Sequence, residues 1–323
     1  MQKQIYIGID VSNTTLDICV RQEHSLESFV INNQTKDIKR FFKPYANKAL
    51  IIGMENTGRY NWSLYEALAG TAHNVFVISP LHLKKSMGLI RGKNDKVDAE
   101  RIACFIEKHH NDLKPWKGSS VSIQKIKILL TERTFRIKNR SQLRKQQLDY
   151  SKMRNLGLDR SLSKLNEQLI LQLDKQIATI EEQIEAVINS NEVLQKQAKL
   201  IKTVPGVGKV LCWIMLSKTE GFTTIDNPRK MACYSGVVPF DYQSGTSIKG
   251  KNRVSIYADK SVKSVLHLAA MSAIRLKNDL RQYYQRKVAE GKNKMSVLNA
   301  IRNKIIHRIF AVVKNQKEYL VLS

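Results

Sequence analysis

The chain has 323 residues, and its 54 Lys and Arg outnumber its 28 Asp and Glu, which gives a formal net charge of +26. This length allows two or three domains with cores of their own. So large a positive excess predicts a polyanionic partner, with nucleic acid the first choice and an anionic membrane surface the second.

Other broad features exclude several classes of protein. No apolar run approaches the roughly 18 residues that span a bilayer, so an integral membrane protein is not expected. The N-terminus enters a strand directly, without a signal peptide. The four cysteines are far apart and lack C-x-x-C spacing, so neither a disulfide framework nor a metal cluster is expected. These features predict a cytoplasmic protein.

The first strong pattern lies in residues 5–20. Ile5, Ile7, Ile9 and Val11 alternate with Tyr6, Gly8 and Asp10, which predicts a strand that turns into a hairpin partner over 15–20. An acid in a central strand is costly unless it is paired or holds a metal. Gly8 leaves room for another element to approach. The alternative is an acid at a strand end that only shapes a turn.

Strand and helix patterns then alternate up to about residue 112. The almost wholly apolar run 49–54 predicts a buried strand that leads directly into Glu55. Ligands of open α/β sheets bind at this carboxyl edge. The remaining predicted elements are a strand at 28–31, helices at 35–45 and 59–68, a strand at 75–79 and a helix at 95–108.

Asp95 and Asp98 are three residues apart, so they project from one face of the last of these helices. Taken alone, the pair is better explained by a solvated helix start, where the helix dipole favours acids. Together, Asp10, Glu55, Asp95 and Asp98 predict a site for Mg²⁺ or Mn²⁺, since such hard cations take oxygen ligands and assist phosphodiester chemistry. A hairpin followed by strand–helix alternation is the order of a ribonuclease H-like fold.

Residues 113–200 are predicted to form a long helical hairpin that turns near 155–159. Its first arm is basic, with 11 Lys or Arg against 3 acids between 120 and 160. An apolar stripe over 162–187 predicts a coiled coil and self-association. The arm's arginines are predicted to contact nucleic-acid phosphates, with a merely solvated face as the alternative. They are Arg133, Arg136, Arg140 and Arg144.

Two signals mark residues 201–323. Gly206 and Gly208, between apolar helices, predict a helix–hairpin–helix whose backbone approaches a phosphate; the alternative is an ordinary tight turn. Ser244 begins a predicted polar loop, Ser-Gly-Thr-Ser, and a serine hydroxyl needs a base or metal to become a nucleophile. From these residues alone, a flexible turn is the better explanation of the loop. Three cations follow it as candidate nucleic-acid contacts: Lys249, Lys251 and Arg253.

Motifs along most of the chain resemble one family. GIDVSNTTLDI, MENTGRY, VFVISP and KNDKVDAERIA, then VPGVG, YSGVVP and QSGTS, occur in the order seen in DEDD (RuvC-like) transposases and recombinases of insertion sequences, which include the Piv-type invertases. The resemblance implies a RuvC-like α/β domain over 1–112, a basic helical region over 113–200, and a mostly helical transposase domain over 201–323.

The resemblance also implies chemistry and partners. Asp10, Glu55, Asp95 and Asp98 become catalytic metal ligands, and Ser244 becomes the nucleophile that forms a covalent phosphoserine link to DNA. Double-stranded donor and target DNA, a bridge RNA as guide, a homodimer or homotetramer, and a prokaryotic nucleoid location are implied as well. The stretch 257–261 departs from the family's Lys-x-Gly-Asn, and Lys-Asn-Asp replaces Lys-Thr-Asp before the helix acids.

Alternative functions stay open. Sugar kinases and actin-like ATPases share an early Asp hairpin, but their second phosphate hairpin and Gly-Gly adenosine loop are not found. Tyr283 and Tyr284 lack the Arg/His/Lys set of a tyrosine recombinase. A structure-selective nuclease would use the same acids without a covalent intermediate, and a non-catalytic scaffold would need none of them. His267, on a largely apolar helix, is interpreted as a packed residue.

Overall fold

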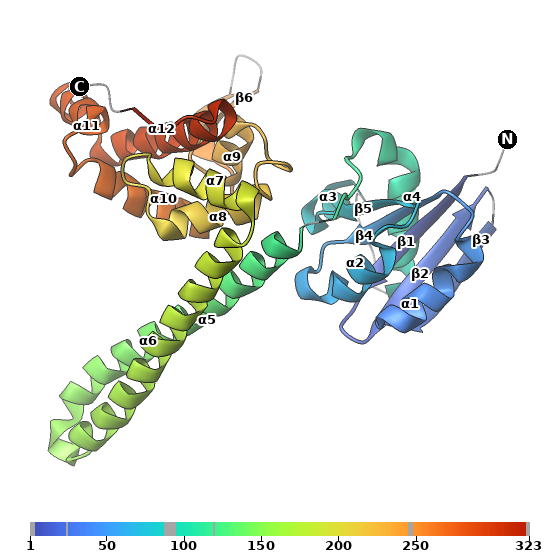
Figure 1. Cartoon of the computed structure of the whole chain (residues 1–323), viewed down its shortest axis with the longest axis horizontal. Helices are drawn as coiled ribbons and strands as arrows, with labels where there is room; N and C mark the ends of the chain where they lie inside the picture. Colours follow the sequence, from blue (N-terminus) through green and yellow to red (C-terminus); the bar gives the residue numbers. More distant parts are fainter. Residues whose placement is uncertain (1–3, 24, 87–94, 119, 245–247, 321–323) are drawn as a thin grey trace. The chain divides into compact units, whose positions relative to one another are not determined.

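The computed structural model describes residues 4–23, 25–86, 95–118, 120–244 and 248–320, without the side chains of 151 and 241–252. The chain divides into two compact units, 1–118 and 119–323. Figure 1 shows the strands of the first unit and the helices of the second. The division of function into three regions stays a prediction.

The first unit is built on a five-stranded sheet in the order β3-β2-β1-β4-β5. β1 pairs antiparallel with β2 and parallel with β4, while β5 continues the parallel side. This is the order of a ribonuclease H-like fold, so the predicted fold class is confirmed. The strands are β1 Ile5–Val11, β2 Thr15–Gln22, β3 Ser25–Asn32, β4 Leu50–Glu55 and β5 Asn74–Ile78.

Alternation along β1 explains the core of this unit. Ile5, Ile7, Ile9 and Val11 are buried, and they pack with residues of β2, β4, α1 and α2 on one face of the sheet. On the other face, α4 packs against β1, β2 and β4. The helices of this unit are α1 Thr35–Phe42, η1 Lys43–Tyr45, η2 Gly58–Asn61, α2 Trp62–Leu68, α3 Pro80–Ser86, α4 Asp95–His109 and η3 His110–Asp112.

The second unit is mostly helical and has one continuous apolar core around Trp213, which is fully buried. Its helices are α5 Val121–Tyr150, η4 Ser151–Leu156, α6 Asp159–Asn189, α7 Glu192–Lys202, α8 Lys209–Thr219, α9 Pro228–Tyr234, α10 Lys260–Ala273, α11 Asp279–Ala289 and α12 Lys294–Asn315. Among the helices that the structure describes, none has the length and apolarity needed to cross a bilayer.

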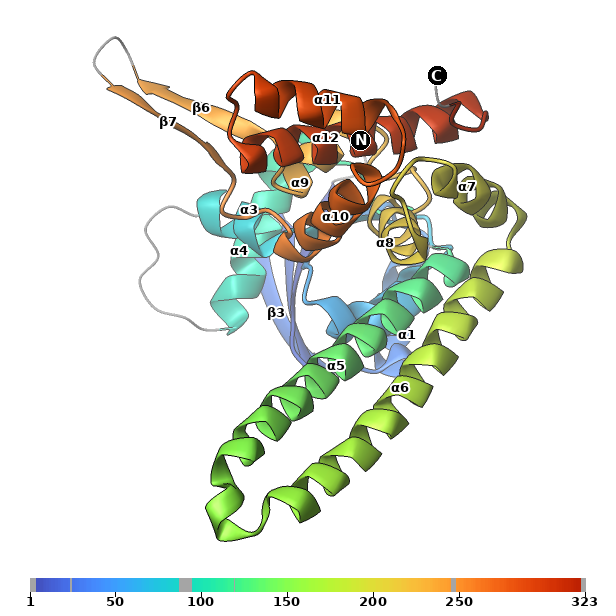
Figure 2. The same ribbon diagram turned by 90° about the vertical axis from the view of Figure 1, so that its left-hand side faces the viewer.

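α5 and α6 form the predicted helical hairpin and lie side by side, with their inner ends against α8 and α7 and their outer ends extending away from the other helices of their unit (Figures 1 and 2). Gly157, with φ of 68°, ends the turn at η4. The predicted apolar stripe lies on a helix, but over the outer part of α6 it does not coincide with the face that is buried against α5. There Asn166 and Ile170 are buried, whereas Leu165 and Leu169 are exposed. The leucines recur with a helical period, but they lie on a different face of α6 from the residues that are buried against α5.

Residues 239–244 and 248–254 form two paired strands that the sequence did not predict, and of the predicted Ser244–Ser247 loop the structure describes only Ser244, which ends a strand. β6 Pro239–Ser244 pairs antiparallel with β7 Ile248–Val254, and Ser244 lies opposite Ile248 at the end of β6. Figure 2 shows this hairpin projecting from the helices of the second unit. The Gly-Thr-Ser that follows Ser244 lies outside the described residues.

Candidate active site

Two glycines allow α4 to lie directly on the sheet. A Cβ on Gly8 would stand 2.2 Å from the carbonyl oxygen of Ala99 and 2.3 Å from the amide nitrogen of Ala103. Gly53, the register partner of Gly8 on β4, lies under Ile102 and Ile106, which a Cβ there would approach to 3.1–3.2 Å. The element for which Gly8 leaves room is therefore α4.

This contact fixes where the acids meet. Asp10 lies two residues beyond Gly8 and so on the same face of β1, as Glu55 lies two residues beyond Gly53 on β4. On α4, Asp95 lies one turn before Ala99, and Asp98 lies one turn before Ile102. Because α4 runs opposite to both strands, its first turn reaches the carboxyl ends that carry Asp10 and Glu55.

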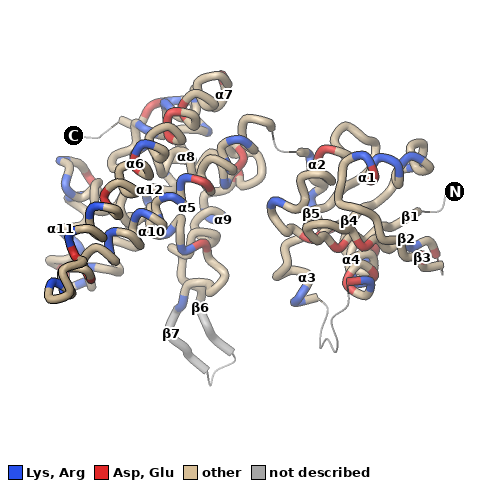
Figure 3. Tube along the Cα trace, turned by 90° about the horizontal axis from the view of Figure 1, so that it is seen from below, with Lys and Arg blue, Asp and Glu red and all other residues tan. Residues whose placement is uncertain are grey.

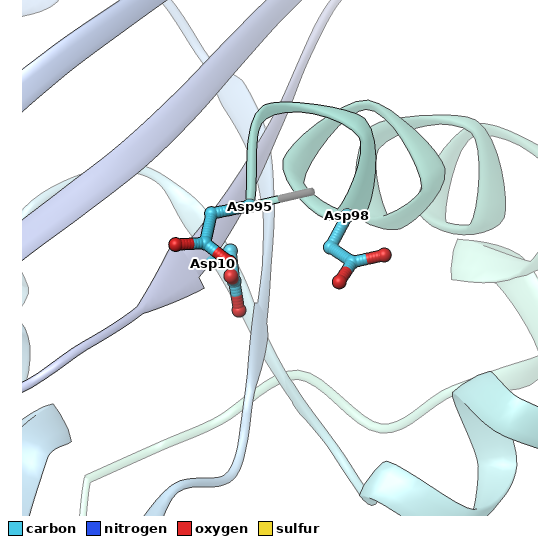
Figure 4. A group of neighbouring side chains, drawn as sticks. All are labelled: Asp10, Asp95 and Asp98. Atoms are coloured by element: carbon cyan, nitrogen blue, oxygen red, sulfur yellow. The ribbon is translucent and has the colours of Figure 1, made fainter. Parts of the chain in front are cut away.

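Three of the four predicted acids converge within the described residues. Carboxylate oxygens of Asp10, Asp95 and Asp98 all lie within 4.8 Å of one another. Figure 4 shows the three side chains, one from β1 and two from the first turn of α4. Asp95 is exposed and the other two are half-buried, so the group opens to solvent. This spacing suits one divalent cation held by oxygens from two elements.

The electrostatics of Asp10 agree with this spacing. Burial, followed by the negative charges of Glu55, Asp95 and Asp98, raises the pKa of Asp10 to about 6, against the lowering effect of a backbone hydrogen bond from Val11. Like charges this close disfavour ionisation of all of them together. A bound cation would remove that penalty, so the cluster is a candidate cation site.

Glu55 acts on Asp10 electrostatically from the neighbouring strand but is not one of the three acids within 4.8 Å. Arg101 binds Asp98 at 2.8 Å and restrains its side chain. One acid was missed: Asp17 lies directly opposite Asp10 on β2, and burial and Asp95 raise its pKa. The period-2 spacing across the Ser12–Thr15 turn would have placed Asp17 on the same face.

Ser244 belongs to the second unit, and the four acids belong to the first. The backbone of Ser244 ends β6, and the backbones of Lys249 and Lys251 lie on β7. The side chains of these three residues lie outside the described part of the chain, while Arg253 on β7 is exposed. The role of Ser244 stays a prediction.

The arginines of α5 bind acids and amides within the helical hairpin. Nε of Arg133 donates to Glu181 at 2.7 Å, and Nε of Arg136 donates to Gln176 at 2.9 Å. Arg140 and Arg144 both pair with Asp174 of α6. These contacts give all four arginines a structural role between α5 and α6, and their contact with phosphates stays a prediction.

The turn between α7 and α8 holds the two predicted glycines. Gly206 has φ of 83°, and a Cβ there would stand 2.4 Å from the carbonyl oxygen of Ala269. Packing against α10 therefore explains Gly206. Gly208 is the exposed N-cap of α8, and a Cβ there would meet open space. Gly208 is therefore the more exposed of the two glycines for the predicted phosphate contact.

Comparison with known proteins agrees with this arrangement. A DEDD-type family model of the IS110 group, described as "Transposase", matches residues 7–150, and the model of the "Transposase IS116/IS110/IS902 family" matches residues 198–285. The pilin gene-inverting protein of Moraxella bovis is 25% identical over 97% of both chains. That of Moraxella lacunata is 26% identical over the same shares.

A ribonuclease H-like sheet with converging acids, followed by a second matched transposase region, defines a DNA recombinase or transposase. The chain belongs to the IS110/IS116 family of insertion-sequence transposases and DNA invertases.

Proposed function

We propose that the chain recombines the DNA of its own insertion sequence under the guidance of a bridge RNA, through a covalent phosphoserine intermediate. The observation that carries the proposal is the convergence of Asp10, Asp95 and Asp98 within the region matched by the DEDD transposase model. Double-stranded donor and target DNA are the substrates. In this proposal, residues 1–112, 113–200 and 201–323 act as the RuvC-like, helical and serine-bearing regions.

The acidic cluster fits Mg²⁺ or Mn²⁺, because its donors are carboxylate oxygens whose mutual repulsion a cation would relieve. Asp10, Asp95 and Asp98 would hold the cation, with Glu55 beside them. When bound, the cation stabilises charge on the oxygens of the phosphate that reacts. Arg101 keeps the Asp98 carboxylate in place before binding.

The proposed strand transfer begins at Ser244. Its Oγ forms a bond to the phosphorus of one DNA phosphodiester, and the bond from that phosphorus to one deoxyribose oxygen breaks. The hydroxyl proton of the serine ends on the leaving oxygen. The phosphodiester bond energy is kept in the phosphoserine link, so a deoxyribose hydroxyl of another strand can attack it and reseal DNA. Since the acids lie in the other unit, both units must meet at one DNA strand, from one copy or from two.

Charge supports nucleic-acid partners. Figure 3 shows Lys and Arg along the helices of the second unit, and the whole chain carries a net charge of +26. Even if every Asp and Glu paired with a Lys or Arg, many basic side chains would remain without an acidic partner. Such an excess favours binding to the phosphate backbone of nucleic acids. The RNA guide, a location at the prokaryotic nucleoid, and assembly into a dimer or tetramer belong to this proposal. The exposed Leu165 and Leu169 of α6 support assembly.

The test is made in cells that carry the whole element, so that any guide RNA is present. Tagged wild type, Ser244→Ala, Asp10→Asn and a control, Ser190→Ala, are purified under denaturing conditions, and attached DNA is measured. The control changes an exposed serine at the C-cap of α6. We expect an adduct in wild type and control, none with Ser244→Ala, and none with Asp10→Asn.

Other outcomes discriminate the alternatives. Cut DNA without an adduct, dependent on Asp10 but not on Ser244, would replace the proposal with a metal-dependent nuclease. Recombination that survives both substitutions would leave a nucleic-acid-binding scaffold. RNA guidance is tested separately by deleting the element's non-coding flank, which should abolish excision while leaving protein levels unchanged.

A further inference from the structure

Arg302 of α12 is a buried cation whose described neighbours include no carboxylate. It is 5% exposed. Its Nη1 donates to the Oδ1 of Asn299 at 3.2 Å, its Nη2 contacts Nδ1 of His267 at 2.7 Å, and its Nε is buried without a hydrogen-bond partner. A guanidinium does not lose its proton in a protein, so this charge persists. A buried charge without an opposite charge is strongly unfavourable.

The same helix offers a direct comparison. Arg308, six residues further along α12, donates to Asp279 of α11, with Nη1 to Oδ1 at 3.2 Å. A structural arginine in this unit is therefore paired with a carboxylate, as buried charges usually are. Arg302 departs from that pattern. Its missing partner is an anion that the described residues do not supply.

A second cation lies beside it. Lys263 of α10 is half-buried, and both burial and the charge of Arg302 lower its pKa. His267 is one turn further along α10 and is also half-buried. The sequence-based interpretation of His267 as simply packed is therefore incomplete. Two positive groups held together on facing helices repel each other, and an anion between or beside them would reverse that repulsion.

Arg302 also determines which ring nitrogen of His267 carries the proton. A guanidinium has no acceptor, so Nδ1 of His267 accepts from it, and in the neutral ring the proton is on Nε2. The imidazole is thereby fixed as a hydrogen-bond donor through Nε2–H. Lys263 and His267 are then two donors on one face of α10, i and i+4, with the buried guanidinium behind them.

The group lies at the base of the β6–β7 hairpin. Nδ2 of Asn299 donates to the carbonyl of Val237 at 2.6 Å, two residues before β6 begins. A Cβ on Gly236 would stand 3.9 Å from Cδ of Lys263. Ser244 is five residues beyond Pro239, about 17 Å along a strand. A group bound here is thus distinct from the phosphate that Ser244 is proposed to attack.

We propose that Lys263 and His267 bind a non-scissile phosphate of the DNA backbone, with Arg302 as the positioning residue that orients His267 and supplies uncompensated positive charge. The assignment of the anion to DNA rests on the proposed function. An ammonium and an imidazole N–H suit a phosphate that needs no base recognition. The contact would hold DNA in register with the hairpin that carries Ser244.

The test is equilibrium binding of the full chain to a duplex DNA oligonucleotide, measured by fluorescence anisotropy over a range of salt concentrations without Mg²⁺. We expect Lys263→Gln and His267→Phe each to weaken binding roughly tenfold, the value of one charge-assisted hydrogen bond. Lys263→Gln should also lower the slope of log affinity against log salt by about one. Lys260→Gln removes the same charge from an exposed position on α10 and should change affinity less.

The variant Arg302→Met distinguishes a role of Arg302 in anion binding from a role in stabilising the fold. If the guanidinium serves an absent anion, an apolar side chain there should leave the Tm unchanged or raise it, while DNA affinity falls roughly tenfold. Arg308→Met, which breaks a carboxylate pair, should lower the Tm. A lower Tm for Arg302→Met with unchanged DNA binding would overturn the proposal, and so would equal losses from Lys263→Gln and Lys260→Gln. Binding needs no adduct, so failure of the Ser244 chemistry would not affect this result.

Discussion

At the scale of single residues, Asp10 lies where burial and the charges of Glu55, Asp95 and Asp98 all disfavour a carboxylate. Asp10→Asn removes one of these charges without changing the shape of the side chain. We expect the Tm of the variant in a metal chelator to exceed that of wild type by a few degrees, because repulsion in the folded state falls. Mg²⁺ should raise the Tm of wild type and not that of the variant. Thermal melts with and without Mg²⁺ measure both effects.

Asp112→Asn is the matched control, since it removes an exposed acid from η3 of the same unit. It should leave the Mg²⁺ response of wild type intact. If Mg²⁺ stabilises Asp10→Asn as strongly as wild type, the cation is held elsewhere and the acidic cluster is not the metal site.

Asp259 explains the stretch 257–261 that departs from the family motif. It caps α10 by accepting from the amides of Ser261 and Val262, and it binds Lys218 of α8 at 2.9 Å. Asn is as good a cap as Asp but carries no charge. We expect Asp259→Asn to cost about 1 kcal/mol of unfolding free energy and Asp259→Ala about 2 kcal/mol, because only Ala also loses the cap. Urea unfolding at pH 7 measures both.

The same residue gives a pH dependence. Burial raises the pKa of Asp259, but hydrogen bonds from Ser261 and Lys218 and the charge of Lys218 outweigh it and hold the pKa well below its usual range. The stabilisation is therefore full above the unfolded value of about 3.9 and is lost as pH falls below it. The gap in stability between wild type and Asp259→Asn should narrow from pH 5 to pH 2.5. A gap that stays constant would contradict the ionic contribution.

At the scale of elements, the site depends on the close approach of α4 to β1. Gly8→Ala places a methyl group 2.2 Å from a backbone oxygen of α4, which has no side chain to move aside. We expect α4 to shift, with a loss of about 3 kcal/mol or more in unfolding free energy and loss of DNA cleavage or adduct formation. Gly53→Ala meets only side-chain atoms at 3.1–3.2 Å and should be tolerated better. Equal stability of the two variants in urea would contradict this account.

Local sequence patterns predicted the individual strands and helices whose formation depends on residues close together in the chain. The alternation of apolar and other residues predicted β1. Gly8 and Asp10, two residues apart on the same face of that strand, indicated a closely packed neighbouring element and a charged site. The helix predicted over 95–108 is α4, which ends one residue later. Local patterns could not show which element met which. The arginines of α5 share related faces, yet only the structure shows that α6 supplies their acids. The strands β6 and β7 were missed because proline, glycine and charged residues, which are poor strand formers, interrupt their few aromatic and β-branched residues.

At the scale of the whole molecule, positive charge and acidic cluster are divided between the units. The four acids lie within 1–118, and the serine-bearing hairpin lies within 119–323. The proposed function therefore assigns the metal-binding acids to one unit and the nucleophile to the other. The change from strand–helix alternation to long helical patterns near residue 112 already separated the acids from Ser244 in the sequence, and the structure places the boundary between the units at residues 118 and 119.

Assembly itself is testable on α6. The positions that face α5 include Ile177, which is 7% exposed, whereas Leu165 and Leu169 are 57% and 48% exposed and lie one turn apart. Replacing both leucines with Gln keeps helix propensity and removes an apolar strip that a second copy would cover. We expect a shift from an oligomer to the 37.0 kDa monomer in light scattering coupled to gel filtration, with unchanged helical content by circular dichroism.

Ile177→Gln provides the contrast, because its side chain is buried against α5 rather than available to a second copy. It should lower the Tm through an unsatisfied buried amide, with any change of mass following from that loss. If the double leucine variant keeps the oligomeric mass of wild type, the contact between copies lies on another surface. The offset leucines of α6 would then be tolerated surface residues, and the coiled coil would serve only to hold α5 and α6 together.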